Sequence, residues 1–219
     1  MIAKGATAEV YEYEEGKICK LFFEGYPVEY INIEYQNAKV MFYLNLNVPK
    51  PFEVVTMDNR TAIIYERIYG KTLWEIWEEN EDKKNEGLDV FVQIHKELLS
   101  HHSKDVLSYK EFLTGMLRGK SVESQELYEE INALPDGDSI LHGDFHPGNI
   151  LVKVDGTPII IDFMNICYGP QLYDIARTFF LLTYHGESVA KSYLNKMQVS
   201  EDEIQTYLHI IKTCRQYEA

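Results

Sequence analysis

Residues 142–149 read HGDFHPGN, and the interpretation of the whole chain depends on them. The stretch places two histidines, an aspartate and an asparagine beside two glycines and a proline, which oppose a regular helix. Three interpretations compete: a polar turn that precedes a strand, a transition-metal site, or a catalytic loop. Because single polar features of this kind are usually structural, the neighbouring residues have to decide.

The loop lies within a strand-rich segment, SILHGDFHPGNILVKVDGTPIIIDF, at residues 139–163. Its Asp155-Gly156 dipeptide is typical of a hairpin turn. An antiparallel pair closed by this two-residue turn places Asn149 opposite Asp162, at about 4.5–5.5 Å. In the same register Pro158 faces Lys153 in a non-hydrogen-bonded pair, where its missing N–H costs little. We therefore expect an amide oxygen and a carboxylate to converge where the hairpin opens.

The transition-metal interpretation uses His142, Asp144 and His146 as ligands. Histidines four residues apart share one face only on a helix, and the glycines and the proline of this loop oppose a helix. The zinc interpretation is therefore weaker than that of a catalytic loop.

The catalytic-loop interpretation rests on two patterns. Residues 142–149 fit H-x-D-x-x-x-x-N, and Asp162 closes the apolar run IIIDF. This is the arrangement of a kinase catalytic loop followed by a metal-binding aspartate. Magnesium prefers oxygen ligands, which Asn149 and Asp162 would supply. Asp144 would accept the proton of an attacking hydroxyl group and orient that group.

The first sixty-odd residues predict a small strand-rich region. TAEVYEYEEGKICKLFF indicates two strands joined at Glu15-Gly16, and FEVVTM with RTAIIYERI indicates a second hairpin around Asp58-Asn59. A helix lies between the hairpins, and VPKP at 48–51 is expected to stop it. One face of that helix carries Ile31, Glu34, Ala38 and Met41.

Beyond Tyr69-Gly70 the pattern changes to amphipathic helices, at roughly 72–80, 88–102, 109–118 and 123–133. We therefore place a lobe boundary near Gly70, between residues 1–68 and residues 69–219.

The composition of the 219 residues is that of a globular protein, with 45% hydrophobic residues and a formal net charge of −14. This acidic balance disfavours nucleic-acid or anionic-membrane surfaces and favours a cationic partner. The apolar runs are too short to cross a membrane. Three scattered cysteines and an N-terminus without a leader pattern lead us to expect a cytoplasmic protein.

HGDFHPGN followed by IIIDF resembles the aminoglycoside phosphotransferase and choline kinase superfamily, the small-molecule branch of the protein-kinase-like fold. That family writes HGD-x-x-x-x-N where protein kinases carry an arginine in second place. The resemblance implies an α+β, bilobal protein-kinase-like fold, with a small antiparallel-sheet N-lobe and a larger, mainly helical C-lobe that carries a catalytic β-hairpin. It also implies a small-molecule kinase that uses Mg²⁺ and takes ATP or GTP as co-substrate.

The resemblance implies that residues 1–68 are the nucleotide-binding N-lobe and that residues 69–219 are the C-lobe, with the catalytic loop, the metal site and the substrate helices. It assigns phosphate-binding roles in the N-lobe. KICKLF resembles the strand with the phosphate lysine, which implies Lys20, and the next helix would supply its partner, Glu34. GATAEV at residues 5–10 resembles the loop that covers the phosphates, which implies nucleotide contacts for Gly5 and Thr7.

The resemblance also assigns the base site and a brace for the loop. RTAIIYERIYG resembles the hinge strand, where the backbone at Glu66 and Ile68 would take the adenine edge, with Ile64 and Tyr65 nearest the base. YGPQLYDIART resembles the helix after the catalytic loop, where Asp174 would brace that loop without touching substrate.

Three departures from the family pattern bear on function. The loop at 5–10 has one glycine, Met164 replaces the glycine of the DFG motif, and GPQ at 169–171 lacks the acidic residue that often follows its glycine. Because the loop at 5–10 has only one glycine, a catalytically silent nucleotide-binding interaction module remains an alternative to an enzyme. The missing HRD arginine argues against a protein kinase.

We expect transfer of the γ-phosphoryl group to a small-molecule hydroxyl acceptor. The acidic balance favours a cationic acceptor, an aminoglycoside or another amine-bearing alcohol. A sugar or amino-acid kinase of the same fold is an alternative, and the sequence leaves monomer and homodimer both open.

Overall fold

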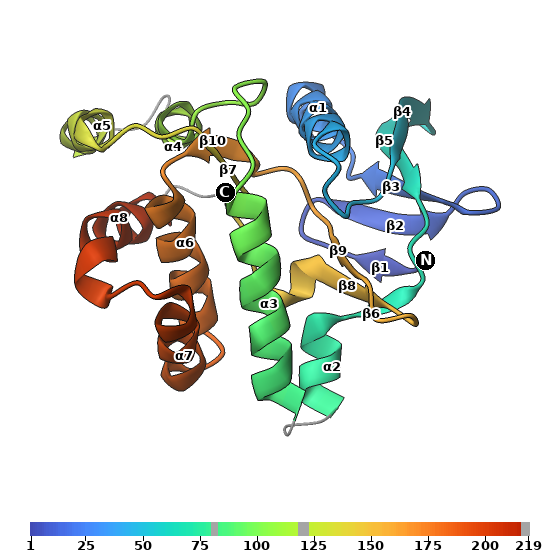
Figure 1. Ribbon diagram of the computed structural model, residues 1–219. Coiled ribbons are helices and arrows are strands. Elements are labelled where there is room, and N and C mark those ends of the chain that lie inside the picture. The colour runs from blue at the N-terminus through green and yellow to red at the C-terminus, as the bar shows by residue number, and fades with distance from the viewer. Residues whose placement is uncertain (80–82, 118–122, 216–219) are drawn as a thin grey trace. The chain divides into compact units, whose positions relative to one another are not determined.

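A computed structural model describes residues 1–79, 83–117 and 123–215 of the chain (Figure 1). Helices and antiparallel strands make up this part of the chain, which is the α+β class expected from the sequence. The chain forms two compact units, Met1–Glu79 with Pro147–Met164 and Asn80–His146 with Asn165–Ala219. The first unit is rich in sheet and the second is mainly helical.

The N-terminal sheet holds β1 (Ala3–Lys4), β2 (Ala8–Glu12), β3 (Lys17–Phe22), β4 (Pro51–Met57) and β5 (Arg60–Glu66). Its strand order is β1-β2-β3-β5-β4, and each neighbouring pair is antiparallel. Both predicted hairpins are present. Gly16, with φ +73°, lies in the β2–β3 turn, and Asp58 and Asn59 connect β4 to β5 with φ of +48° and +63°. Two consecutive positive φ angles suit the right-handed twist of a hairpin.

The two faces of this sheet differ because successive residues of a strand point to opposite sides. On one face Cys19, Ala62 and Ile64 form a buried apolar cluster. Lys20 projects from the other face of β3, beside Ile63 of β5. Helix α1 (Val28–Tyr43) packs on that second face.

Helix α1 buries the face predicted from the sequence, and Asn37 lies on that face as well. The helix ends at Tyr43, several residues before VPKP, which was expected to stop it. Its end comes early because Asn45 takes a left-handed conformation, with φ +59°, that a helix cannot continue.

A second sheet in the same unit has the order β6-β8-β9, with β6 (Gly70–Thr72), β8 (Ile150–Lys153) and β9 (Pro158–Ile160). The short helix α2 (Leu73–Glu79) follows β6, and a 3₁₀ turn, η1 (Pro147–Asn149), precedes β8. The compact units therefore divide the chain differently from the lobes expected at 1–68 and 69–219. Strand pairing is the reason, because β6 hydrogen-bonds to β8 and joins the hairpin to the segment that follows β5.

The register predicted for the β8–β9 hairpin is wrong by one residue. Val152 lies opposite Pro158, and the Ile161 N–H donates to the Asn149 carbonyl at 3.0 Å, so Asn149 faces Ile161 and not Asp162. The loop holds three residues, 154–156, because Gly156 adopts φ +85° as the left-handed third residue of a longer hairpin loop. Pro158 still lies in a non-hydrogen-bonded pair, as expected. The adjacent pair, Lys153 and Thr157, is the hydrogen-bonded one, because the Lys153 N–H donates to Thr157 O.

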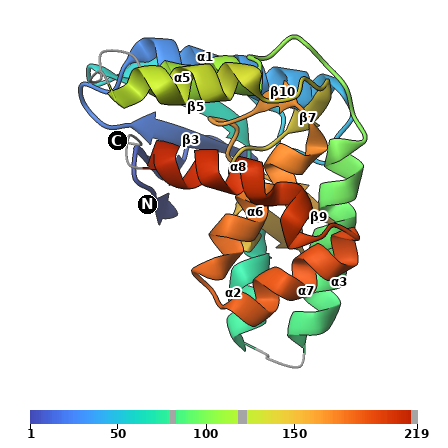
Figure 2. The same ribbon diagram turned by 90° about the vertical axis from the view of Figure 1, so that its left-hand side faces the viewer.

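The second unit packs helices around a two-stranded ladder. Strands β7 (Ser139–Leu141) and β10 (Cys167–Gly169) pair antiparallel. Helix α6 (Gln171–Thr183) packs against α7 (Glu187–Met197) and α8 (Glu201–Cys214), as Figure 2 shows. The unit also contains α3 (Lys83–Leu99), α4 (Tyr109–Met116) and α5 (Glu123–Ala133).

The predicted helices are present; α5 has the expected bounds, 123–133, and α4 begins at the expected residue 109. Helix α3 begins at Lys83, before the expected residue 88, and ends at Leu99. The predicted ends at 80 and 118 lie outside the described residues.

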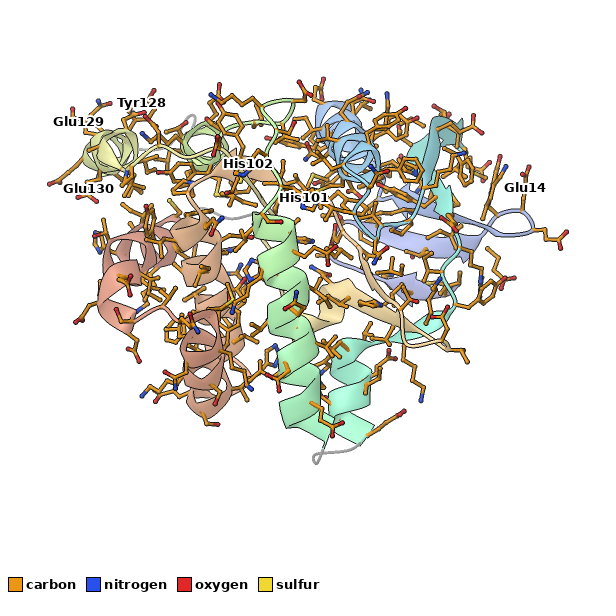
Figure 3. All side chains as sticks on the ribbon, viewed as in Figure 1. Glu14, His101, His102, Tyr128, Glu129 and Glu130 are labelled. Carbon is orange, nitrogen blue, oxygen red and sulfur yellow. The ribbon has the colours of Figure 1, made fainter. Side chains whose placement is uncertain are left out.

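Two adjacent histidines follow α3 (Figure 3): His101 Nδ1 lies 2.8 Å from the Glu97 carbonyl oxygen, and His102 Nδ1 lies 3.1 Å from Asp138 Oδ1. Within the part of the chain described here, none of the helices has the length and apolarity needed to cross a bilayer.

Candidate active site

Lys20 and Glu34 form an ion pair in the first unit. Strand β3 directs Lys20 toward α1, where its Nζ lies 2.7 Å from Glu34 Oε1. The Glu34 side chain is 1% exposed. Tyr65 of β5 donates its hydroxyl hydrogen to the same carboxylate oxygen at 3.2 Å. The structure thus brings together the lysine and the glutamate that the sequence proposed as partners.

Asp162 completes a charged triad with these two residues. Its Oδ1 lies 3.0 Å from Lys20 Nζ, and 45% of its side chain is exposed. The backbone of Asp162 takes φ +69°, which ends the strand-like run and turns this residue out of the hairpin. A non-glycine residue in this region carries a cost of roughly 1 kcal/mol, so the surroundings must hold it there.

The pKa values of the triad have two opposing causes. Burial by itself would lower the pKa of Lys20, but the carboxylates of Glu34 and Asp162 outweigh it and raise that pKa above the ordinary lysine value. Burial raises the pKa of Glu34, which the ammonium of Lys20 opposes. Lys20 therefore stays charged at neutral pH, paired with the buried carboxylate of Glu34.

Asn149 and Asp162 fit a magnesium site by their chemistry. Asn149 is 8% exposed in the η1 turn, and its carbonyl binds the N–H of Ile161, the residue before Asp162. In this structure Asp162 already lies beside a cation, the ammonium of Lys20. Among the described residues, no group of three or more His, Cys, Asp or Glu side chains could hold a metal ion. Magnesium at nucleotide sites needs only one or two carboxylates, and waters and phosphates complete its shell.

Gly5 and Thr7 lie in the turn between β1 and β2. The Gly5 N–H donates to the Ala8 carbonyl at 2.9 Å, and the Thr7 carbonyl accepts from Phe23 N–H at 2.9 Å. A Cβ at Gly5 would meet only ordinary van der Waals contact, with Ala8 O at 3.7 Å. This short turn therefore depends on its backbone hydrogen bonds and not on a glycine at that position.

Glu66 and Ile68 lie where β5 leaves the sheet. The Glu66 N–H donates to Lys50 O at 2.9 Å, and the Arg67 N–H donates to Gly16 O at 2.8 Å. Within the described part of the chain, the Ile68 N–H donates no backbone hydrogen bond. That amide is the backbone donor that the sequence assigned to the adenine edge.

The first part of the candidate catalytic loop, residues 142–146, lies in the second unit, where the Asp174 carboxylate binds its backbone. The backbone N–H groups of His142 and Gly143 each donate to Asp174 of α6, at 2.8 Å. Gly143 has φ +74°, and a Cβ there would clash with the backbone of Asn165. Arg177 Nε donates to the Gly143 carbonyl at 3.1 Å. The loop conformation is therefore possible only with glycine at 143.

Asp174 belongs to a buried polar chain that the sequence did not reveal. His95 of α3 places Nε2 3.0 Å from Asp174 Oδ2 and Nδ1 2.7 Å from the Tyr193 hydroxyl of α7. Burial alone would raise the pKa of Asp174, but the hydrogen bonds from His95 and from the His142 backbone outweigh it and lower that pKa. The carboxylate thus stays ionised in the core. His95 and Tyr193 lack a local motif that could have identified them.

Asp144 and His146 are the half-exposed members of the loop, at 29% and 31% side-chain exposure. Phe145 between them is fully buried and stacks on the His95 ring with centroids 4.2 Å apart. The Asp144 N–H donates to Nδ1 of the buried His142 ring at 3.3 Å, so His142 helps to hold the backbone of the loop. Alternation along the loop thus buries Phe145 and leaves the Asp144 carboxylate accessible.

Asn37 is a buried polar residue near the triad that the sequence analysis missed. Its Nδ2 donates to the carbonyl of Phe163, the residue after Asp162, at 2.9 Å. A usable signal was present, because Asn37 follows Glu34 by three residues and so shares its helix face.

A family model matches most of the chain: residues 2–196 match the phosphotransferase enzyme family, APH. The chain therefore belongs to the phosphotransferase enzyme family. Among curated proteins, none matches this chain in sequence.

Solved structures show the same fold at low sequence identity. An aminoglycoside-3'-phosphotransferase of type VIII has a TM-score of 0.72 and 16% identity, over 97% of this chain and 92% of that one. The choline kinase LicA from Streptococcus pneumoniae has a TM-score of 0.65 and 15% identity, over 99% and 82%. The aminoglycoside phosphotransferase APH(3'')-Id from Streptomyces rimosus, solved with ADP and streptomycin, has a TM-score of 0.64 and 12% identity, over 89% and 85%.

These comparisons confirm the superfamily and the protein-kinase-like fold expected from HGDFHPGN and IIIDF. The protein is a small-molecule kinase of this phosphotransferase family.

Proposed function

We propose that the protein transfers the γ-phosphoryl group of ATP or GTP to a hydroxyl group of an amine-bearing small molecule. The observation that carries the proposal is the Lys20 ammonium fixed between Glu34 and Asp162, at 2.7 and 3.0 Å. Phosphoryl transfer depends mainly on positioning and on neutralising charge, and a lysine that is both held and charged serves each need.

The nucleotide would be held by the first unit. Lys20, kept in place by Glu34, would grip the α- and β-phosphates, and the turn with Gly5 and Thr7 would cover them. The carbonyl of Glu66 and the N–H of Ile68 would bind the edge of the base. The Ile68 N–H donates to no other described residue, and this supports the role because such a donor is available to a ligand.

Magnesium would be held by Asn149 and Asp162 together with the phosphates. When bound, the ion would neutralise charge that develops on the phosphates. In this proposal the phosphates replace Asp162 beside Lys20, which frees that carboxylate for the metal. Asp144 would accept the proton of the acceptor hydroxyl and orient the oxygen for attack.

Two observations support the proposed acceptor class, the net charge and the structural neighbours. The formal net charge of −14 favours a cationic acceptor over an anionic one. Structural neighbours have been solved with streptomycin and with hygromycin B, and another is a choline kinase. All three point to amine-bearing alcohols, so an aminoglycoside or an amino-alcohol is the acceptor that we propose.

The nucleotide site can be tested by thermal denaturation with ATP or GTP, with and without magnesium. A ligand that binds only the folded state stabilises it by about 2.7 kcal/mol at a hundredfold excess over Kd. We expect a magnesium-dependent rise in the melting temperature that Asp162→Asn abolishes. The matched control is Asp155→Asn, in the exposed turn of the same hairpin, which should behave as wild type. The absence of a shift with either nucleotide would overturn the proposal.

The acceptor class needs a separate screen. Radiolabelled γ-phosphate from ATP is offered to aminoglycosides, amino-alcohols, neutral sugars and hydroxy amino acids in parallel. Transfer to the amine-bearing compounds supports the proposed class. Transfer only to neutral sugars or to hydroxy amino acids would retain the kinase and replace its acceptor.

A further inference from the structure

Asn37 occupies a position where a polar side chain is costly. It is 3% exposed on the inner face of α1, where the other buried residues except Glu34 are apolar. A buried amide is tolerated only when hydrogen bonds replace its water. The Nδ2 group of Asn37 donates to the carbonyl of Phe163 at 2.9 Å, a contact between residues 126 positions apart.

The peptide that Asn37 binds is next to the most strained residue of the proposed metal site. Asp162 holds φ +69°, and such a conformation persists when the groups on both sides of it are fixed. On one side the Ile161 N–H donates to Asn149 O at 3.0 Å. On the other side Phe163 is 2% exposed and its ring lies 6.1 Å from that of Tyr65.

Helix α1 therefore carries one charged partner of Lys20 and contacts the residue next to the other. Glu34 binds Lys20 directly, and Asn37, three residues later on the same face, binds the backbone that carries Asp162. One face of α1 thus binds both the Lys20 side chain and the backbone next to Asp162.

We propose that Asn37 is a positioning residue that holds Asp162 in its left-handed conformation and so aims its carboxylate at the magnesium. This inference rests on the proposed function, in which Asp162 is a ligand of that metal. Groups that orient a metal ligand commonly change the metal affinity by about tenfold or more when they are removed. A purely structural asparagine would change stability alone.

The test measures how much magnesium the nucleotide site needs. The probe is AMP-PNP at a fixed concentration, and the melting-temperature shift is followed as magnesium is raised. Asn37→Leu keeps the size of the side chain and removes the donor. We expect the magnesium concentration at half-maximal shift to rise by about tenfold, with the full shift recovered at high magnesium.

The matched control is Asn32→Leu, the same substitution at an exposed position of the same helix, which should leave the magnesium curve unchanged. Asn37→Ala gives a second reading if Asn37→Leu is not recovered folded. A magnesium curve unchanged in the Asn37 variants would overturn the inference, and so would a failure of both variants to fold.

Asp162→Ala separates the two proposals. If this variant leaves the magnesium dependence unaltered, the proposed metal site is wrong, whatever Asn37 does. If it abolishes the dependence while Asn37→Leu has the wild-type curve, the metal site stands and only the role of Asn37 is rejected.

Discussion

Lys20 Nζ and Glu34 Oε1 lie 2.7 Å apart, and the carboxylate is almost completely buried. The two partners depend on this contact unequally. Lys20 keeps a second carboxylate, that of Asp162, at 3.0 Å if Glu34 is neutralised. Among the described residues, Lys20 is the only cationic partner of Glu34.

The two halves of the pair should therefore respond differently to substitution. Lys20→Met leaves a buried carboxylate without its cation, and we expect the unfolding free energy to fall by about 3 kcal/mol. Glu34→Gln removes the buried charge itself, and its effect on stability should be smaller. Chemical denaturation of both variants measures the difference, and a larger loss for Glu34→Gln would contradict this assignment.

The pH dependence of Lys20→Met follows from the raised pKa of Glu34. Burial raises the pKa of this carboxyl group, so the folded state binds its proton more tightly than the unfolded state does. Without Lys20 to oppose that effect, the stability lost in the variant should be recovered in part as the pH falls toward the ordinary glutamate pKa. Denaturation at a series of pH values tests this, and a deficit that grows on acidification would count against it.

Asp144→Asn should separate chemistry from nucleotide binding. The amide keeps the shape of the side chain and cannot take the acceptor proton, so we expect turnover to fall by about a hundredfold or more. The melting-temperature shift with magnesium and nucleotide should stay at the wild-type value. Asp105→Asn, at an exposed carboxylate outside the loop, is the control for both measurements. Undiminished turnover in Asp144→Asn would remove this residue from the mechanism.

Gly143→Ala should disrupt the catalytic loop. Gly143 has φ +74°, and an added Cβ would clash with the backbone of Asn165. Gly16→Ala is the matched control, because Gly16 has φ +73° and a Cβ there meets nothing within 4 Å. The control carries the left-handed cost alone, roughly 1–2 kcal/mol, and should retain activity. Denaturation and turnover are measured for both variants. Equal losses in Gly143→Ala and Gly16→Ala would show that the left-handed backbone alone causes the effect and that the contact with Asn165 does not.

Asp174 should make the protein sensitive to acid. Its pKa is lowered in the folded state, mainly because the hydrogen bonds from His95 and His142 outweigh burial. Its contribution to stability is therefore complete above the ordinary aspartate pKa and is lost as the pH falls through the lowered value. Denaturation of wild type and Asp174→Asn at a series of pH values measures this contribution. The difference between the two curves should shrink with acidification, and a constant difference would refute the assignment.

Local patterns account for much of the fold and part of the candidate site. The resemblance of KICKLF to the strand with the phosphate lysine implied Lys20, and the spacing in IEYQNAKVM placed Glu34 on one face of a helix. The helix spacing is a periodicity of the backbone, so it can be read within a few residues. The stretches HGDFHPGN and IIIDF likewise identified the family, because they carry chemistry at a fixed spacing.

Long-range contacts were not accessible in the same way. The hairpin register depended on whether its loop held two residues or three, a choice made by the conformation of Gly156. The β6–β8 and β7–β10 pairings join distant strands that are only three or four residues long, too short to show a pattern.

The sequence by itself determined the family, the presence of the hairpins and the buried face of the first helix, and it proposed the candidate site residues. Only the tertiary structure decided that Asn37 binds the peptide after Asp162, and that His95 hydrogen-bonds to both Asp174 and Tyr193. The physical reason is that a buried polar group must find its hydrogen-bond partner wherever packing places one. Packing joins residues that the sequence separates, so these partners appear only once the chain has folded.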